Sequence, residues 1–373
     1  MTVNDQKPVL AIDIGGTKFA AGLVDRTGGL TAAVRVPTPP GGNAEALWKT
    51  LSDLLDEVAG DNGPAGVGVG CGGPMAWPEG VVSPLNMPGW HGFPLRERLA
   101  ERYPGVPVRI HNDAVCVAVA EHWQGAGRSG GDTRDDSIRG GNTGGGNTGG
   151  GNTGGDSRGA DNMIGMVVST GVGGGLILNG RLIDGGTGNA GHIGHIIVEP
   201  DGPECGCGGR GCLEAVARGP ALAAWAVSQG WQPSATPYAG TTGTVGTAGM
   251  EGAAGAAGYE EAGQATGRRL AADAAAGDAV ALAAMRRAGR ALGLAIASAT
   301  HLCDIDLVTI GGGLSQAGRL LFDPLEETLR AHARMGFARR VRVVPAALGQ
   351  DAGLIGAAAL LLVGHRYWSP TTN

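Results

Sequence analysis

A strand, a glycine-rich polar turn and a second strand occur twice in this chain, and this repetition constrains the fold more than any other feature. The first copy runs from Val9 through the turn GGTK to Val24, and the second from Met163 through Thr170-Gly171 to Leu178. Two apolar runs joined by such a turn predict a β-hairpin. The first turn also offers backbone N–H groups, a hydroxyl and an ammonium group to one point, which suits a phosphate.

Two motif searches limit the interpretation of these glycines. The first turn is not a Walker A loop, because GxxxxGK[ST] is absent and a strand follows where that motif has a helix. Asp13, at the end of the first strand, could hold Mg²⁺ through water molecules. A GxGxxG match from Gly68 to Gly73 is not a dinucleotide site, because Pro74 and a loop follow it. An ordinary hairpin turn remains the alternative interpretation of DIGGTK.

A second feature is a cluster of metal-ligating residues in one short, glycine-rich stretch. Cys205, Cys207 and Cys212 supply three thiolates, and His195, just upstream, is the candidate fourth ligand of a tetrahedral zinc ion. Such a shell is full, so we predict a structural zinc that fixes the ring of His195 and directs Glu214. The alternatives are reduced cysteines in a surface loop, or a disulfide, which would leave one cysteine over.

A third feature is the polar pair Asn112-Asp113 at the junction of a β-rich run and an apolar helical segment. One interpretation makes Asp113 the N-cap of that helix. The other makes it a general base that accepts a proton from a substrate hydroxyl, because strand ends that lead into helices are where open α/β sheets bind ligands. The two interpretations are compatible.

Composition sets the remaining bounds. A chain of 373 residues is long enough for two domains, and its net charge of −6 argues against a nucleic-acid or anionic-membrane partner. Six cysteines, half of them clustered, fit a reducing compartment. No signal-peptide pattern and no apolar run of membrane-spanning length occurs, so we expect a cytoplasmic protein. We expect two flexible low-complexity insertions, at residues 125–161 (with GGNTG in tandem) and 236–263.

Hydrophobic periodicity predicts further elements. We expect an amphipathic helix over residues 44–60, one or two alanine-rich helices over 266–303, and a helix from about Ser315 after the strand that ends in Gly311-Gly-Gly. A closing apolar helix is expected to begin at Gln350.

These motifs together resemble one family. The run CGCGGRGCLE beside GHIGH is similar to the zinc loop of the ROK family (repressors, open reading frames and kinases), whose kinases phosphorylate hexoses. DIGGTK is similar to the first phosphate motif of the sugar kinase/actin/Hsp70 superfamily, and HNDA resembles the catalytic aspartate with its preceding sugar-binding asparagine. The resemblance runs from Asp13 to about Leu362, interrupted by the two low-complexity stretches.

The resemblance implies an α/β chain with the two-domain sugar kinase/actin/Hsp70-like (ribonuclease H-like) fold and an interdomain active-site cleft. We expect a small N-terminal α/β domain at residues 1–112, completed by the C-terminal helix 351–366. The large α/β domain would comprise residues 113–350, including the zinc loop 195–212. A homodimer is also expected.

The function implied is that of an ATP-dependent hexokinase, which transfers the γ-phosphoryl group of ATP to the 6-hydroxyl of an aldohexose with Mg²⁺ present and Asp113 as general base. The implied ATP-binding residues are Asp13, Gly15, Gly16, Thr17, Lys18, Thr170, Gly171, Gly311, Gly312 and Gly313. The implied sugar-binding residues are Gly73, Asn86, Asn112, Asp113, His192, His195 and Glu214. The implied structural Zn²⁺ ligands are His195, Cys205, Cys207 and Cys212. Asn86 has an equally good interpretation as a turn residue before Pro88.

The substrate stays open because two segments disagree. Most ROK glucokinases carry glutamate where this chain has His192, and an imidazole cannot accept two hydrogen bonds as a carboxylate does. GHIGH resembles instead the bacterial N-acetylmannosamine kinases, whereas LNMPGW resembles the glucokinases. The candidates are therefore glucose and an N-acetylhexosamine (N-acetylmannosamine or N-acetylglucosamine), and His192 favours the acylated sugar.

Two rival functions come from other classes. A ROK-type sugar-sensing transcriptional regulator would need a DNA-binding domain ahead of the first phosphate motif, and only twelve residues precede Asp13. A non-catalytic sugar-binding protein is disfavoured because Asp113, DIGGTK and Thr170-Gly171 are all intact. A phosphoryl donor other than ATP, such as polyphosphate, is not excluded by these motifs.

Overall fold

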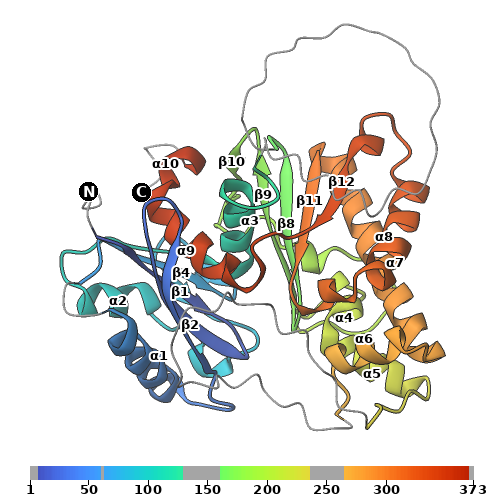
Figure 1. The fold of residues 1–373 in the computed structure, drawn as a ribbon, viewed down its shortest axis with the longest axis horizontal. Helices are drawn as coiled ribbons and strands as arrows, with labels where there is room; N and C mark the ends of the chain where they lie inside the picture. The colour runs from blue at the N-terminus through green and yellow to red at the C-terminus, as the bar shows by residue number, and fades with distance from the viewer. Residues whose placement is uncertain (1–6, 60–62, 129–159, 236–263, 369–373) are drawn as a thin grey trace, which may run out of the picture.

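The computed structural model describes residues 7–59, 63–128, 160–235 and 264–368 (Figure 1). Most of the first predicted insertion and all of the second lie outside these ranges, so their expected flexibility stays a prediction. Within the described ranges, no helix has both the length and the apolar character needed to cross a membrane.

Two five-stranded mixed sheets with the same topology form the centre of the fold. The first has the order β3-β2-β1-β4-β7, and the second the order β10-β9-β8-β11-β12. The strands of the first sheet are β1 (Val9–Ile14), β2 (Lys18–Val24), β3 (Leu30–Pro37), β4 (Val67–Cys71) and β7 (Val108–Asn112). Those of the second are β8 (Met163–Val168), β9 (Val172–Leu178), β10 (Arg181–Leu182), β11 (Leu307–Gly311) and β12 (Arg342–Pro345).

Each sheet contains one of the two predicted hairpins. Strands β1 and β2 pair antiparallel, as do β8 and β9. On its other side, the first strand of each hairpin pairs in parallel with a further strand, β1 with β4 and β8 with β11. The repeated strand–turn–strand pattern therefore corresponds to a repeated sheet. A small ribbon of β5 (Met75–Ala76) and β6 (Val81–Val82) lies outside both sheets.

The predicted helices are present, with shifts at two starting points. The helices are α1 (Ala44–Ala59), α2 (Leu95–Arg102), α3 (Asp113–Trp123), α4 (Leu213–Ala217), α5 (Gly219–Ser228), α6 (Gly267–Ala275), α7 (Ala279–Cys303), α8 (Arg319–His332), α9 (Ala352–Leu362) and α10 (Gly364–Tyr367). The helices expected at Ser315 and Gln350 begin later, at Arg319 and Ala352, because a short 3₁₀ turn precedes each (Gly313–Ala317 and Gly349–Asp351).

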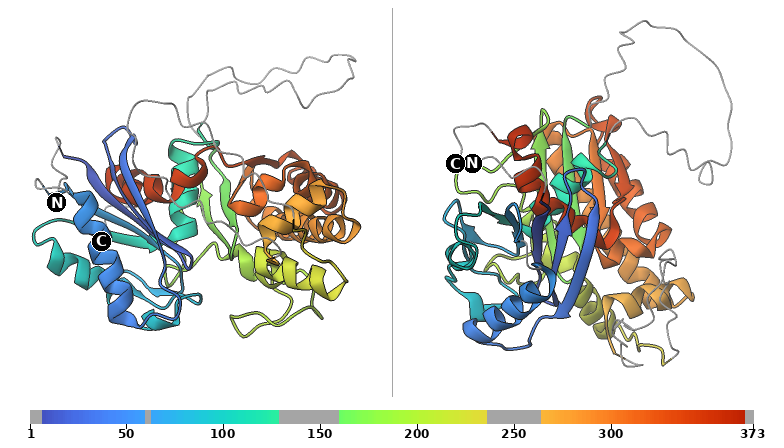
Figure 2. Two further views of the ribbon diagram at one scale, coloured as in Figure 1. Left: turned by 60° about the horizontal axis from the view of Figure 1, so that its bottom comes forward. Right: turned by 60° about the vertical axis from the view of Figure 1, so that its left-hand side comes forward.

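Helices α3 and α9 lie between the two sheets (Figure 1), and the left view of Figure 2 shows the same arrangement. Helix α9 packs on β1 and β4 of the first sheet, α3 packs on β8 and β9 of the second, and the two helices pack on each other. Their approach requires a glycine: a Cβ atom added to Gly356 in α9 would lie 1.9 Å from the carbonyl oxygen of Cys116 in α3. The backbones of α3 and α9, which are far apart in the sequence, are therefore in direct contact between the two sheets.

A buried hydrogen-bonded chain connects the end of the first sheet to the second. His111 in β7 is 2% exposed, and its Nδ1 accepts a hydrogen bond from the backbone N–H of Asn112 at 2.8 Å. The ring proton must therefore reside on Nε2, which donates to Oδ1 of Asp184, just after β10, at 2.9 Å. The other carboxylate oxygen of Asp184 accepts from the indole N–H of Trp368 at 2.7 Å. Three distant segments meet at this one carboxylate.

Replacing Asp184 with alanine is expected to lower the free energy of unfolding by roughly 2–4 kcal/mol, because two buried N–H donors lose their acceptor. Chemical denaturation of the purified variants measures this. Asp201→Ala is the control, since Asp201 is exposed and its carboxylate makes no interaction with other described residues. Equal stabilities for the two variants would contradict the role given to the Asp184 carboxylate.

Candidate active site

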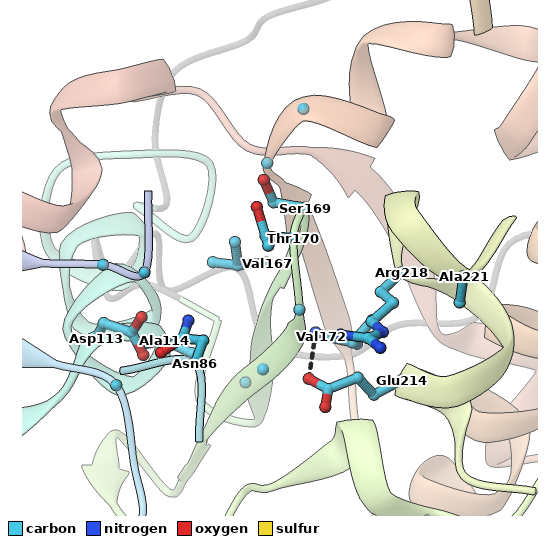
Figure 3. A pocket seen from close by; sticks show the side chains of 18 of the residues that line it. Asn86, Asp113, Ala114, Val167, Ser169, Thr170, Val172, Glu214, Arg218 and Ala221 are labelled. Carbon is cyan, nitrogen blue, oxygen red and sulfur yellow. Dashed lines mark hydrogen bonds between the residues drawn. The ribbon is translucent and has the colours of Figure 1, made fainter. Parts of the chain in front are cut away.

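A cavity of about 2260 Å³ opens between the two sheets and is lined by both. All the residues that the sequence analysis assigned to ATP or sugar line this one cavity. Its volume exceeds that of a pocket for one small ligand, so it can hold two substrates side by side. Figure 3 shows Asp113 and Asn86 on one side of it, and Thr170, Glu214 and Arg218 on the other.

The junction of β7 and α3 presents Asp113 to the cavity. The prediction that Asp113 caps α3 is wrong: Asn112 is the N-cap, and its Oδ1 accepts from the backbone N–H groups of Ala114 (3.0 Å) and Val115 (3.4 Å). Asp113 is the first residue of the helix, and its Oδ1 accepts from the same Ala114 N–H at 2.8 Å. Asparagine and aspartate are equally good capping residues, so sequence alone does not distinguish them.

Burial gives Asp113 the character of a base. It raises the pKa of Asp113 to about 6, and the nearby negative charge of Asp13 adds to this, while the hydrogen bond from Ala114 acts in the opposite direction. Burial also raises the pKa of Asp13, and the positive charges of Lys18 and Arg35 oppose that rise. At neutral pH Asp113 is therefore ionised and still a stronger base than an exposed carboxylate.

Two polar groups converge beside Gly73. A Cβ atom added to this glycine would lie 3.1 Å from Nδ2 of Asn112 and 3.3 Å from Nε2 of His192. Because Oδ1 of Asn112 is used in capping α3, its Nδ2 is the group that faces this point. Nδ1 of His192 donates to the carbonyl of Asn189 at 2.8 Å, since a carbonyl can only accept, and Nε2 is therefore left as an acceptor.

The two hairpin turns face the cavity with glycine backbone and polar side chains. Gly16 of the first turn lies against Asn86, because an added Cβ atom would come within 2.4 Å of the Asn86 amide nitrogen. In the second sheet, Gly312 has a φ of +88°, and its added Cβ atom would lie 2.4 Å from the carbonyl oxygen of Val168. The glycine turn after β11 is thereby brought next to Thr170-Gly171.

Glu214 lies against the second hairpin. Its Oε2 accepts from the backbone N–H of Val172 at 2.8 Å (dashed line in Figure 3), and a Cβ atom on Gly171 would lie 2.8 Å from the same oxygen. One oxygen of this carboxylate is thus used to hold the Thr170-Gly171 turn. The sequence analysis had assigned Glu214 to the sugar alone.

The four predicted metal ligands come together. The ligand atoms of His195, Cys205, Cys207 and Cys212 all lie within 4.8 Å of one another. Nδ1 of His195 is 3.7 Å from the Cys205 sulfur, and the sulfurs of Cys207 and Cys212 are 3.8 Å apart. A tetrahedral ion with metal–sulfur bonds of about 2.3 Å separates its sulfurs by about 3.8 Å, so this donor set fits zinc. The ring of His195 stacks on His192, with 6.2 Å between centroids.

The sequence analysis missed three groups at this site. Arg218 and Arg268 line the cavity on the side of the second sheet, and His111 holds the backbone of Asn112 from behind. One signal was available for Arg218: it occupies the N-cap position of α5, where short polar side chains are preferred. The contact of His111 with Asp184 spans 73 residues and leaves no local pattern.

Comparison with known proteins gives the same family throughout. The model of the family described as "ROK family" matches residues 9–133 and 149–363. A glucokinase of Thermotoga maritima is 32% identical over 358 residues, covering 95% of this chain and 96% of that protein. An N-acetylmannosamine kinase of Escherichia coli O7:K1 is 32% identical over 356 residues, covering 95% of this chain and 98% of that protein.

A solved structure extends the similarity to three dimensions. The ROK family glucokinase from Streptomyces griseus, in complex with glucose and AMPPNP, has a TM-score of 0.69 and 29% identity, with 95% of this chain and 98% of that chain covered. The expected two-domain sugar kinase/actin/Hsp70-like fold with its interdomain cleft is confirmed. The chain belongs to the ROK family.

Proposed function

We propose that this chain is an ATP-dependent hexokinase that transfers the γ-phosphoryl group of ATP to the 6-hydroxyl of an aldohexose. The observation that carries the proposal is a buried carboxylate, Asp113, in a cavity that two glycine-rich hairpin turns line from opposite sheets. Similarity to a glucokinase and to an N-acetylmannosamine kinase over nearly the whole chain supports it.

Asp113 acts on the sugar hydroxyl. Its carboxylate accepts the proton of the 6-hydroxyl while the bond from that oxygen to the γ-phosphorus forms and the bond to the bridging oxygen of ADP breaks. Nδ2 of Asn112 donates a hydrogen bond to the sugar, and Gly73 leaves room for the ring beside it. A base positioned in this way contributes roughly 10²- to 10⁴-fold to the rate.

The two hairpins hold the triphosphate. Thr17 and Lys18 of the first turn and Thr170 of the second contribute a hydroxyl, an ammonium group and a second hydroxyl to the same cavity. The glycines at 311–313 let adenosine approach the backbone. Mg²⁺, when bound, would neutralise charge on the phosphoryl group in transfer. Asp13 would hold it through water molecules, since a hard cation prefers oxygen ligands and retained waters.

His192 bears on the choice of sugar. With Nδ1 committed to Asn189, its Nε2 presents one acceptor to the sugar pocket beside Gly73. A single acceptor matches the single N–H of an acetamido group, whereas a carboxylate accepts from two hydroxyls. We therefore favour an N-acetylhexosamine over glucose.

Measuring ADP release with ATP, Mg²⁺ and either glucose, N-acetylglucosamine or N-acetylmannosamine tests the function and the substrate together. We expect the highest kcat/KM with an acetamido sugar and a shift toward glucose in His192→Glu. An unchanged preference in that variant would remove the role given to His192. No ADP release with these or other hexoses would contradict the kinase function itself.

The pKa of Asp113 predicts an acid limb in the pH profile. The ionised carboxylate is the active form, so kcat/KM is expected to fall below about pH 6, by roughly tenfold per pH unit once protonation dominates.

Asp113→Asn should lower kcat by roughly 10²- to 10⁴-fold and keep sugar binding, measured by calorimetry. Its residual activity should lack the limb, whereas Glu57→Gln, at an exposed residue outside the cavity, should retain it. Near-normal turnover in Asp113→Asn would exclude this base.

We propose zinc for the site of three cysteines and one histidine, with a structural role. Metal analysis of the purified protein is expected to find one zinc per chain, and chelation should lower the melting temperature. The KM for sugar should rise more than that for ATP, because Nδ1 of His195 would bind the metal while its ring packs on His192. Cys212→Ser should behave like the chelated protein and Cys303→Ser like the wild type. Protein without bound metal and with unchanged stability under chelation would refute this.

Two expectations on organisation are kept as proposals. The domain division into 1–112 with 351–366, and 113–350, is supported by the separate apolar cores on the outer faces of the two sheets, while a third core contains residues of both units. The homodimer expected from the family resemblance is a prediction that light scattering can test.

A further inference from the structure

Two arginines line the cavity without an acidic partner. Arg218 immediately precedes α5, and Arg268 lies in the first turn of α6. Neither guanidinium forms a hydrogen bond or ion pair with another of the residues that the structure describes. By contrast Arg287, which also lines the cavity, pairs with Glu199 at 2.6 Å. The first two arginines thus present uncompensated positive charge to the cavity.

Local stability does not account for Arg218. It is both the C-cap of α4 and the N-cap of α5, yet its side chain makes no capping hydrogen bond. Serine, threonine, asparagine or aspartate is favoured at an N-cap, and the dipoles of α4 and α5 act on a cation at this junction in opposite directions. An arginine whose guanidinium makes no local contact at an N-cap position points to a task beyond the two helices.

The fold fixes both arginines beside the second hairpin turn. The N–H of Gly219 donates to the carbonyl of Ser169 at 2.9 Å, so α5 begins on that turn. A Cβ atom added to Gly267 would lie 2.6 Å from the Cα of Gly219, so the starts of α5 and α6 are in backbone contact. Figure 3 shows Arg218 beside Val172 and Glu214. The two arginines therefore flank the place where the second hairpin meets the cavity.

Charge complementarity identifies the ligand. The carboxylates of Asp13, Asp113 and Glu214 all line this cavity, and Lys18 is the cation that the first hairpin contributes. A triphosphate between the hairpins would meet this negative charge and needs cations on the second side as well. Guanidinium groups suit that task, because their fork of N–H donors matches two phosphate oxygens at once.

We propose that Arg218 and Arg268 bind the phosphate chain of the nucleotide donor from the second sheet, opposite Lys18 on the first. This inference rests on the proposed kinase function and adds contacts to it that the hairpin motifs do not include. The arginines neutralise the donor's phosphates, and the adenosine and sugar subsites do not depend on them.

The variant Arg218→Ser tests the proposal, because it is expected to change nucleotide binding without lowering the stability of the protein. Serine is a preferred N-cap, so the melting temperature should stay equal or rise. The KM for ATP should rise roughly 10- to 100-fold, as expected for loss of a charged hydrogen-bonding group, with the KM for sugar unchanged. Arg268→Ser should shift the KM for ATP in the same direction, and Arg218→Lys should recover part of the loss. Arg334→Ser, an exposed arginine outside the cavity, is the control.

Calorimetric binding of AMPPNP and of adenosine separates the possible outcomes. We expect Arg218→Ser to weaken AMPPNP and leave adenosine unchanged. If Arg218→Ser weakens the binding of AMPPNP and adenosine equally, or leaves the affinity for AMPPNP unchanged, the proposed phosphate site is wrong. The kinase function still stands in that case, provided that the wild type phosphorylates a hexose. A wild type that transfers no phosphoryl group from ATP refutes the proposed function, and loss of AMPPNP affinity in Arg218→Ser would still support the anion site.

Discussion

The hydrogen bonds by which Asn112 caps α3 determine how the whole site is presented. Because the Asn112 oxygen is occupied by two backbone N–H groups, its amide nitrogen must face Gly73 and His192. Asp113 then falls at the first helical position, with its carboxylate in the cavity. The preceding residue, His111, accepts from the Asn112 N–H and is itself held by Asp184. Three successive side chains therefore hold the backbone, direct an amide nitrogen toward Gly73 and place a buried carboxylate in the cavity.

The metal loop is connected to both halves of the reaction. On one side, the ring of His195 packs on His192, whose Nε2 faces Asn112 across Gly73. On the other, the chain leaves Cys212 into α4, and Glu214 in its first turn accepts from the N–H of Val172. Metal in this loop would thus orient the sugar side and, through one carboxylate, the second hairpin turn. A structural ion can affect both substrates without contacting either.

Local patterns predicted the hairpins, the metal ligands and the strand-end aspartate, because each depends on residue spacing within a short stretch. The cap of α3 could not be assigned, since Asn112 and Asp113 are both good caps and only the extended backbone of Asn112 (φ −59°, ψ 141°) decides between them. The link from His111 to Asp184 and Trp368 joins segments far apart in the sequence, and Arg218 matters only because α5 begins on the Ser169 carbonyl. These features depend on tertiary contacts that no window of sequence contains.

Two carboxylates in one cavity have different electrostatic surroundings because their neighbours differ. Asp113 and Asp13 are both buried, and burial raises the pKa of each. For Asp13 the positive charges of Lys18 and Arg35 oppose that rise. For Asp113 the nearby charge is that of Asp13 itself, which raises its pKa further and strengthens it as a base. The charge of Asp13 therefore links the two carboxylates, because it raises the pKa of Asp113 for as long as no cation balances it.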